Sequence, residues 1–143
     1  MYYTDVEDCQ IGGVTIPGVQ AVAVSQKAEE VALEWGATGP HVIFADVVRT
    51  RVTVRVTHAL AREGAGEGVP EPVLDAPALG DAVALRFVIR PGRASRATEC
   101  TAACICTGIE HEGGAKGAVV RTLVLEAISS DGAEAPLTST VLD

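Results

Sequence analysis

The sequence has very few aromatic residues, which make up 3% of its 143 positions. Hydrophobic residues still account for 48% of the chain, so valine, alanine, leucine and isoleucine must fill the core. Many of these side chains are β-branched, and such residues fit the pleated surface of a sheet. The length suits one domain with one core. We therefore expect residues 1–143 to form a single, mainly β domain.

Long apolar runs and a basic leader are also missing. No apolar stretch approaches the roughly 18 residues of a membrane-spanning helix. The N-terminal segment from Met1 to Asp8 is acidic and lacks the basic region of a signal peptide. These absences predict a protein that is made in the cytoplasm and has no membrane partner.

Basic residues are scarce relative to acidic ones, with 11 Lys and Arg against 19 Asp and Glu and a formal net charge of −8. Proteins that wrap nucleic acid bind its phosphates through Lys and Arg. The charge balance therefore argues against a nucleic-acid-wrapping protein. It is compatible with a surface past which DNA slides without being held, because like charges repel.

There are only four cysteines. Cys100, Cys104 and Cys106 fall at even positions of one expected strand, so they would share a face. Neighbours two apart on a strand rarely form a disulfide. Metal sites need spaced pairs or nearby histidines, and His111 has the opposite parity. The cysteines are predicted to be reduced thiols that pack as small hydrophobic groups.

Signatures of catalysis are absent as well. The three histidines are far apart in the sequence: His41, His58 and His111. No Gly-x-Ser-x-Gly or His-Glu-x-x-His motif occurs. The glycines of 64–68 surround Glu67 and lack the lysine of a phosphate-binding loop. Glu99, Glu110 and Glu112 are interpreted as solvated charges. The sequence therefore predicts a protein that is not an enzyme and uses no cofactor or metal.

Period-two alternation is the clearest pattern that is present. From Val48 to Leu60, Val52, Val54 and Val56 alternate with polar residues, as in a half-buried strand. Further strands are expected at 11–19 (two short ones around a Gly/Pro turn), 19–24, 31–35, 82–89, 98–111 and 118–129. A loop with Lys27, Glu29 and Glu30 would separate two of them. Seven to nine strands at this spacing predict a sandwich or barrel with one long hairpin.

Residues 63–81 form a long acidic segment with four Gly, three Pro and no Lys or Arg. Loops of this length are often functional, and we expect an inter-subunit loop that is ordered only in the assembly. Its acidic residues are Glu63, Glu67, Glu71, Asp75 and Asp81. The basic residues that follow are Arg86, Arg90, Arg93 and Arg96. Arg90, Arg93 and Arg96 form either ordinary surface charge or a patch that receives the acidic loop of another copy. Residues 130–143 are expected to be an arm or a last strand.

The order of segments along most of the chain resembles the major tail tube proteins of long-tailed phages, especially those with non-contractile tails. The resemblance rests on four segments: Ile11–Val24 with its Ile-Gly-Gly-Val-Thr-Ile-Pro-Gly-Val start, Phe44–Val56, Gly80–Phe87 and Ser129–Leu137. It implies a β-sandwich-like domain, often with one short helix, of which six copies form a ring. Rings stack into a tube in the virion tail, with other tail proteins as partners, and DNA passes through without specific binding.

The resemblance also directs attention to the hairpin of 98–111 and 118–129. Its larger apolar residues have odd numbers and are expected in the core: Ile105, Ile109, Val119, Leu123 and Leu125. The even residues are smaller or more polar and are expected to line the channel: Cys100, Ala102, Cys104, Cys106, Thr122 and Glu126. Glu126 and Thr122 are the predicted channel-facing residues. A slip of one residue would exchange the two faces.

Three other classes remain open. A tail terminator or head–tail joining protein would have the same sequence features. A non-enzymatic β-sandwich binding module would need an exposed aromatic platform, for which few residues are available. A small β-barrel hydrolase or isomerase would need the catalytic constellation that the sequence lacks.

Overall fold

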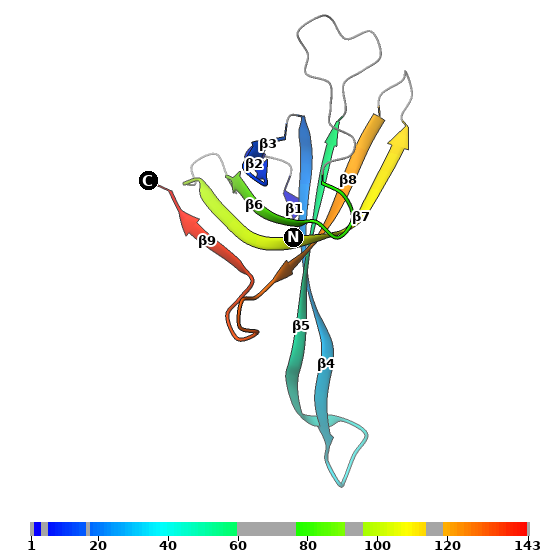
Figure 1. The fold of residues 1–143 in the computed structure, drawn as a ribbon. Helices are drawn as coiled ribbons and strands as arrows, with labels where there is room; N and C mark the ends of the chain where they lie inside the picture. Colours follow the sequence, from blue (N-terminus) through cyan, green and yellow to red (C-terminus); the bar gives the residue numbers. More distant parts are fainter. Residues whose placement is uncertain are drawn as a thin grey trace, which may run out of the picture.

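The structure is a computed structural model that describes residues 2–3, 6–16, 18–59, 77–90, 96–113 and 119–142. These residues form nine strands and no helix (Figure 1). The strands are β1 (Tyr2–Tyr3), β2 (Val6–Ile11), β3 (Val14–Thr15), β4 (Val19–Trp35), β5 (Val42–Ala59), β6 (Ala82–Ile89), β7 (Thr98–Gly113), β8 (Val119–Ile128) and β9 (Leu137–Val141). The mainly β prediction is confirmed.

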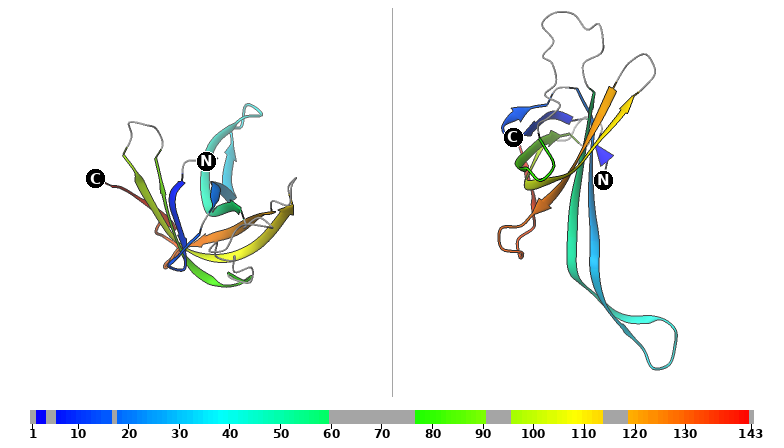
Figure 2. Two further views of the ribbon diagram at one scale, coloured as in Figure 1. Left: turned by 90° about the horizontal axis from the view of Figure 1, so that it is seen from above. Right: turned by 45° about the vertical axis from the view of Figure 1, so that its right-hand side comes forward.

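All nine strands belong to one antiparallel sheet with the order β1-β4-β5-β8-β7-β6-β2-β3. β9 pairs with β7 over Thr98–Ala102, where β8 no longer covers that edge. The sheet curls around its apolar face without closing into a barrel (Figure 2). The strands thus form a single curled sheet where a sandwich or barrel was predicted. The last strand expected within 130–143 is present as β9.

The turn between β2 and β3 follows directly from the sequence. Ile11 pairs with Val14, which leaves Gly12 and Gly13 as a two-residue hairpin loop. Both glycines have positive φ, 63° and 80°. The type I′ turn requires positive φ at both central positions, and glycine adopts it without a steric penalty. The sequence predicted a Gly/Pro turn within 11–19; the turn seen here is formed by the two glycines, and Pro17 lies outside the described residues.

The loop predicted around Lys27, Glu29 and Glu30 is wrong, because β4 runs unbroken for 17 residues. Its partner β5 starts at Val42, earlier than predicted, and is 18 residues long. Cross-strand pairs of opposite charge stabilise an antiparallel ladder, and Arg49 lies 3.2 Å from Glu30. The ladder with β5 therefore keeps this polar segment extended although its own sequence has no apolar alternation.

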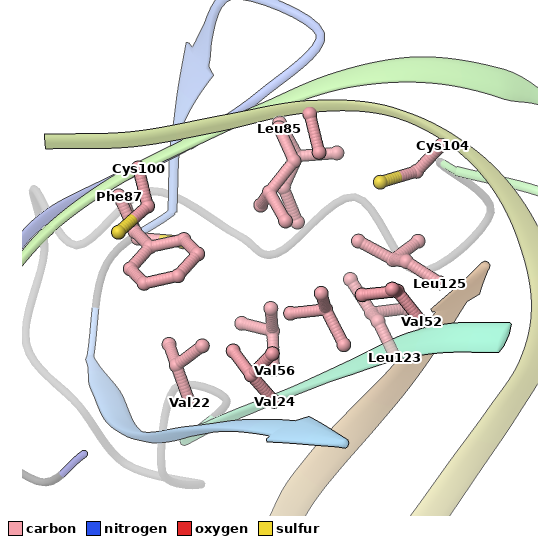
Figure 3. Packing of buried hydrophobic residues seen from close by; sticks show 14 of the residues in the cluster. Val22, Val24, Val52, Val56, Leu85, Phe87, Cys100, Cys104, Leu123 and Leu125 are labelled. Carbon is pink, nitrogen blue, oxygen red and sulfur yellow. The ribbon is translucent and has the colours of Figure 1, made fainter. Parts of the chain in front are cut away.

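The core lies inside the curl of the sheet (Figure 3). It is formed by alternate residues of β2, β4, β5, β6, β7 and β8: Cys9, Ile11, Val22, Val24, Val52, Val54, Val56, Leu85, Phe87, Ile89, Cys100, Ala102, Cys104, Cys106, Leu123 and Leu125. Phe87 is the only aromatic residue among them and is fully buried. The predicted inward face of β5 is confirmed.

The prediction that odd-numbered residues of the 98–129 hairpin point into the core is correct for one strand and wrong for the other. On β8, the odd residues Leu123 and Leu125 are fully buried as predicted. On β7 the prediction is wrong, because the even residues are the buried ones: Cys100, Ala102, Cys104 and Cys106. Ile105 is only half-buried. The side chain of Val119 lies outside the described residues.

The register of the hairpin explains the error. Residues that face each other across a ladder share a face of the sheet. Cys106 pairs with Leu125, so an even position of β7 shares a face with an odd position of β8. A bulge at Thr107 then shifts the register, and beyond it Ile109 pairs with Leu123. Odd-numbered residues of the two strands share a face of the sheet only in some registers, and a bulge changes which ones do.

The buried thiols lead to a first prediction. All four cysteines are free and buried, as expected of packed thiols. Burial raises the pKa of Cys9 and of Cys104 to about 11, and a nearby carboxylate contributes in each case. Only the thiolate reacts readily with disulfide reagents. We expect no reaction of the native protein with a coloured aromatic disulfide at neutral pH, and reaction of all four thiols in denaturant. Rapid reaction of a native thiol would contradict this burial.

Candidate assembly surface

The distal half of the β4–β5 hairpin projects from the rest of the domain as an arm, defined here as residues 25–51 (Figures 1 and 2). Every residue of the arm is exposed except Gly36, which is half-buried. The core ends at Val24 on β4 and begins again at Val52 on β5. The arm is therefore not held in place by packing against its own subunit.

One face of the arm is apolar. Residues 31, 33 and 35 alternate along β4, and the ladder pairs them with 47, 45 and 42 of β5. The apolar face therefore consists of Val31, Leu33, Trp35, Val42, Ala45 and Val47. The five larger of these side chains are between 42% and 58% exposed. A contiguous exposed apolar surface marks a site of interaction with another molecule.

The opposite face of the arm is mixed. Ala32 pairs with Asp46, and Glu34 pairs with Phe44. Two carboxylates therefore interrupt this face, which makes the arm amphipathic. Ile43 and Val48 occupy positions where the register shifts, and both are exposed.

The edges of the arm have no partner strand within the part of the chain that the structure describes. β1 pairs with β4 only at Val22 and Ala23, and β5 pairs with β8 only from Thr53 onward. The arm ladder has three register shifts. Bulges and charged edge residues are devices by which proteins prevent strands from adding to an open edge. The arm therefore offers a partner its apolar face more readily than its backbone.

The predicted channel residue Glu126 lies at the base of the arm, on the face of the sheet that points away from the core. Its Oε1 accepts hydrogen bonds from Arg51 Nε at 2.7 Å and from Thr53 Oγ1 at 3.0 Å. The Arg51 guanidinium holds the pKa of Glu126 below its usual value. Thr122 is half-buried on the same face, and its hydroxyl lies 3.3 Å from that of Thr57. Both residues lie on the face of β8 to which the sequence assigned them.

The acidic loop and the basic patch are only partly described. Glu63, Glu67, Glu71 and Asp75 of the predicted inter-subunit loop, and Arg93 of the patch, lie outside the described residues. Asp81 shapes the turn before β6, because its Oδ2 accepts a hydrogen bond from the Ala78 amide at 2.9 Å. Arg96 is exposed just before β7.

Arg90 of the predicted patch and the neighbouring Arg86 form ion pairs inside the subunit. Arg90 Nε donates to Glu7 at 2.7 Å. Arg86 bridges Asp8 at 2.7 Å and Glu99 at 2.8 Å. The charge that Arg86 and Arg90 would bring to a neighbouring copy is thereby largely compensated within their own chain.

His58 and Arg121 form a buried polar pair that was not predicted from the sequence, where His58 was noted only as far from the other histidines. Arg121 Nε donates a hydrogen bond to His58 Nε2 at 2.9 Å. The residues are 3% and 2% exposed. The alternation of buried residues could have revealed this pair. His58 continues the buried even-numbered positions of β5, and Arg121 continues the buried odd-numbered positions of β8. An acceptor nitrogen at Nε2 requires the neutral imidazole.

The protonation state of His58 leads to a second prediction. Burial, and then the charge of Arg121, lower the pKa of His58 from 6.5 to about 4. Between these values the unfolded chain binds a proton that the folded chain does not, so stability falls as the pH decreases through this range. From about pH 7 to about pH 5, this group should lower the free energy of unfolding by about 2 kcal/mol.

The control for this prediction is His58→Gln, which keeps an acceptor for Arg121 but does not titrate. Urea unfolding at several pH values measures both proteins. The difference in stability between wild type and variant should shrink, or reverse, as the pH falls through this range. Parallel pH profiles of the two proteins would contradict a neutral, buried His58.

Comparison with known proteins identifies no relative of this chain. The sequence matches no protein-family model and no curated protein. In the described ranges, no group of three or more His, Cys, Asp or Glu side chains could hold a metal ion. The same ranges contain no helix long and apolar enough to cross a membrane.

Proposed function

We propose that this protein is a structural virion subunit that assembles with copies of itself, and that its assembled form is the tail tube of a long-tailed phage. The arm carries the proposal. Its apolar face stays exposed in a single subunit, and assembly is the simplest way to cover it. The order of segments that resembles major tail tube proteins favours a tube over other assemblies.

In this proposal, copies form rings, six to a ring as the resemblance implies, and the rings stack. An arm on one end of a subunit that contacts a different surface on the next copy makes a heterologous interface. Such interfaces close into rings or continue as filaments. The tube would join other tail proteins in the virion after synthesis in the host cytoplasm.

The outer face of β5 and β8 has properties that suit a channel for DNA. Two arginines on this face lie next to glutamates, Arg51 beside Glu126 and Arg55 at 3.6 Å from Glu110. Compensated arginines attract phosphates less than free ones, because the paired carboxylate repels the same anion. DNA would therefore pass along such a wall without being retained. Thr122 and Glu126 keep their proposed role as channel-facing residues.

Analytical sedimentation across micromolar to millimolar concentration tests the proposal. Self-assembly predicts species that grow with concentration through mass action. A single species with the mass of one chain at every concentration, also after other tail components are added, would exclude a tube protein.

A further inference from the structure

A second surface of the molecule has the properties of a receptor for the arm. A groove of about 580 Å³ lies over the outer face of β6, β7 and β9, where residues 129–136 border it. Its floor includes the row formed by Ala84, Ala103 and Ile128, which face one another across three strands. Ala135 and Pro136 form part of its wall. Ile128 is 46% exposed there.

Two residues that line the groove are charged, Arg86 and Glu134, and Glu134 is an exposed residue of the bordering segment. The guanidinium of Arg86 is held between Asp8 and Glu99. The hydroxyls of Thr101 and Thr138 lie 2.8 Å apart and share one hydrogen bond. A docked apolar surface would therefore leave the charge of Arg86 paired. The carboxylate of Glu134 would have to stay at the solvent-exposed border of the groove, because burying an unpaired charge is costly.

The loop that borders the groove is held by its own hydrogen bonds. Asp131 Oδ1 accepts hydrogen bonds from the amides of Ala133 at 2.9 Å and Glu134 at 3.0 Å. The Ser129 hydroxyl accepts one from the amide of Gly132 at 3.0 Å. These bonds order the loop before any partner binds, which lowers the entropic cost of docking.

We propose that the apolar face of the arm of one copy docks in this groove of a second copy. This inference rests on the proposed self-assembly, and it identifies the two surfaces in contact as the apolar face of the arm and the groove. The arm extends about 35 Å from Val24 to Trp35 at the usual rise per residue of a strand. It is a continuous ladder that leads away from the rest of the sheet (Figures 1 and 2). Its apolar face therefore lies away from the groove of its own subunit.

Docking of this kind uses side chains and not strand addition. The register shifts of the arm disturb the regular edge that a further strand would need. The apolar face, in contrast, presents the side chains of three alternate cross-strand pairs. Because donor and receptor surfaces differ, the contact can repeat from copy to copy.

Trp35 provides the measurement, because it is the only tryptophan of the chain and is 58% exposed on the apolar face. Assembly of the wild type should shift its emission to shorter wavelength and protect it from quenching by acrylamide. Leu33→Asp on the arm and Ala103→Arg in the groove change exposed positions, so both variants should fold. Each should abolish the shift and raise the apparent dissociation constant at least about tenfold.

Two matched controls keep the apolar face and the groove intact. Ala32→Asp adds the same charge to the opposite face of the arm. Val141→Arg adds a cation at an exposed position of β9, on the face opposite to that of the groove residue Thr138. Both should assemble like the wild type. Circular dichroism checks that all four variants keep the sheet.

Mixing the two defective variants gives the sharpest test. The intact arm of Ala103→Arg fits the intact groove of Leu33→Asp, so an equimolar mixture should recover the Trp35 shift for half of its tryptophans. A shift that persists in Ala103→Arg alone would overturn the groove as receptor and indicate contact between two arms. Wild-type assembly with an unchanged Trp35 would overturn docking but leave the proposed function intact. If neither the wild type nor any variant assembled, both the docking proposal and the proposed function would be overturned.

Discussion

Shortening the arm is expected to leave a folded subunit that no longer assembles. Lys27 and Arg51 face each other across the ladder, so an Asn-Gly turn can join them in place of residues 28–50. The core residues of β4 and β5 all lie outside the removed segment. We expect sedimentation to show the mass of one chain at concentrations where the wild type assembles.

The same variant separates stability from assembly. The removed residues are exposed except for Gly36, so urea unfolding of the subunit at low concentration should change by less than about 1 kcal/mol. A shortened protein that forms the same assemblies as the wild type would show that the arm has no part in them. A protein that fails to fold would mean that the arm stabilises the sheet, contrary to its exposure.

Replacing Phe87 with alanine should destabilise the subunit by about 3–5 kcal/mol, the usual cost of removing a large buried aromatic side chain. Phe87 is fully buried and pairs with Cys9 on one side and Cys100 on the other. Small neighbours of this kind cannot fill the space that the ring leaves. The loss would be a large part of the 5–15 kcal/mol that stabilises a typical domain.

The chain contains one other phenylalanine, which serves as the matched control. Phe44 lies on the arm and is 51% exposed, so Phe44→Ala should change the stability by no more than about 0.5 kcal/mol. Urea unfolding followed by circular dichroism gives both values, because the single tryptophan lies on the arm and does not sense the core. Equal effects of the two substitutions would contradict the core described here.

The sequence predicts the inward face of a strand when apolar and polar residues alternate along it because one face is buried. Val52, Val54 and Val56 on β5 showed their inward face in the sequence alone. The inward face of β7 was not predictable in this way, because the register with β8 decides it. A bulge at Thr107 changes that register, and no local signal places the bulge.

The arm was the harder feature to predict. Ser25 to Glu30 has no apolar alternation, so the sequence indicated a loop that would separate two short strands. The ladder with β5 supplies the missing reason for an extended chain, and that pairing depends on residues about 20 positions away. The assembly role was predicted from the resemblance, whereas the surfaces that would perform it became visible only in the structure.

Electron microscopy of the purified wild-type protein in negative stain is the decisive test of tube assembly through the arm. We expect rings and stacked tubes of uniform diameter at concentrations where sedimentation shows assembly, and none with the shortened-arm variant at the same concentration. Fields of single small particles for the wild type at every concentration, or tubes that form equally well without the arm, would contradict it.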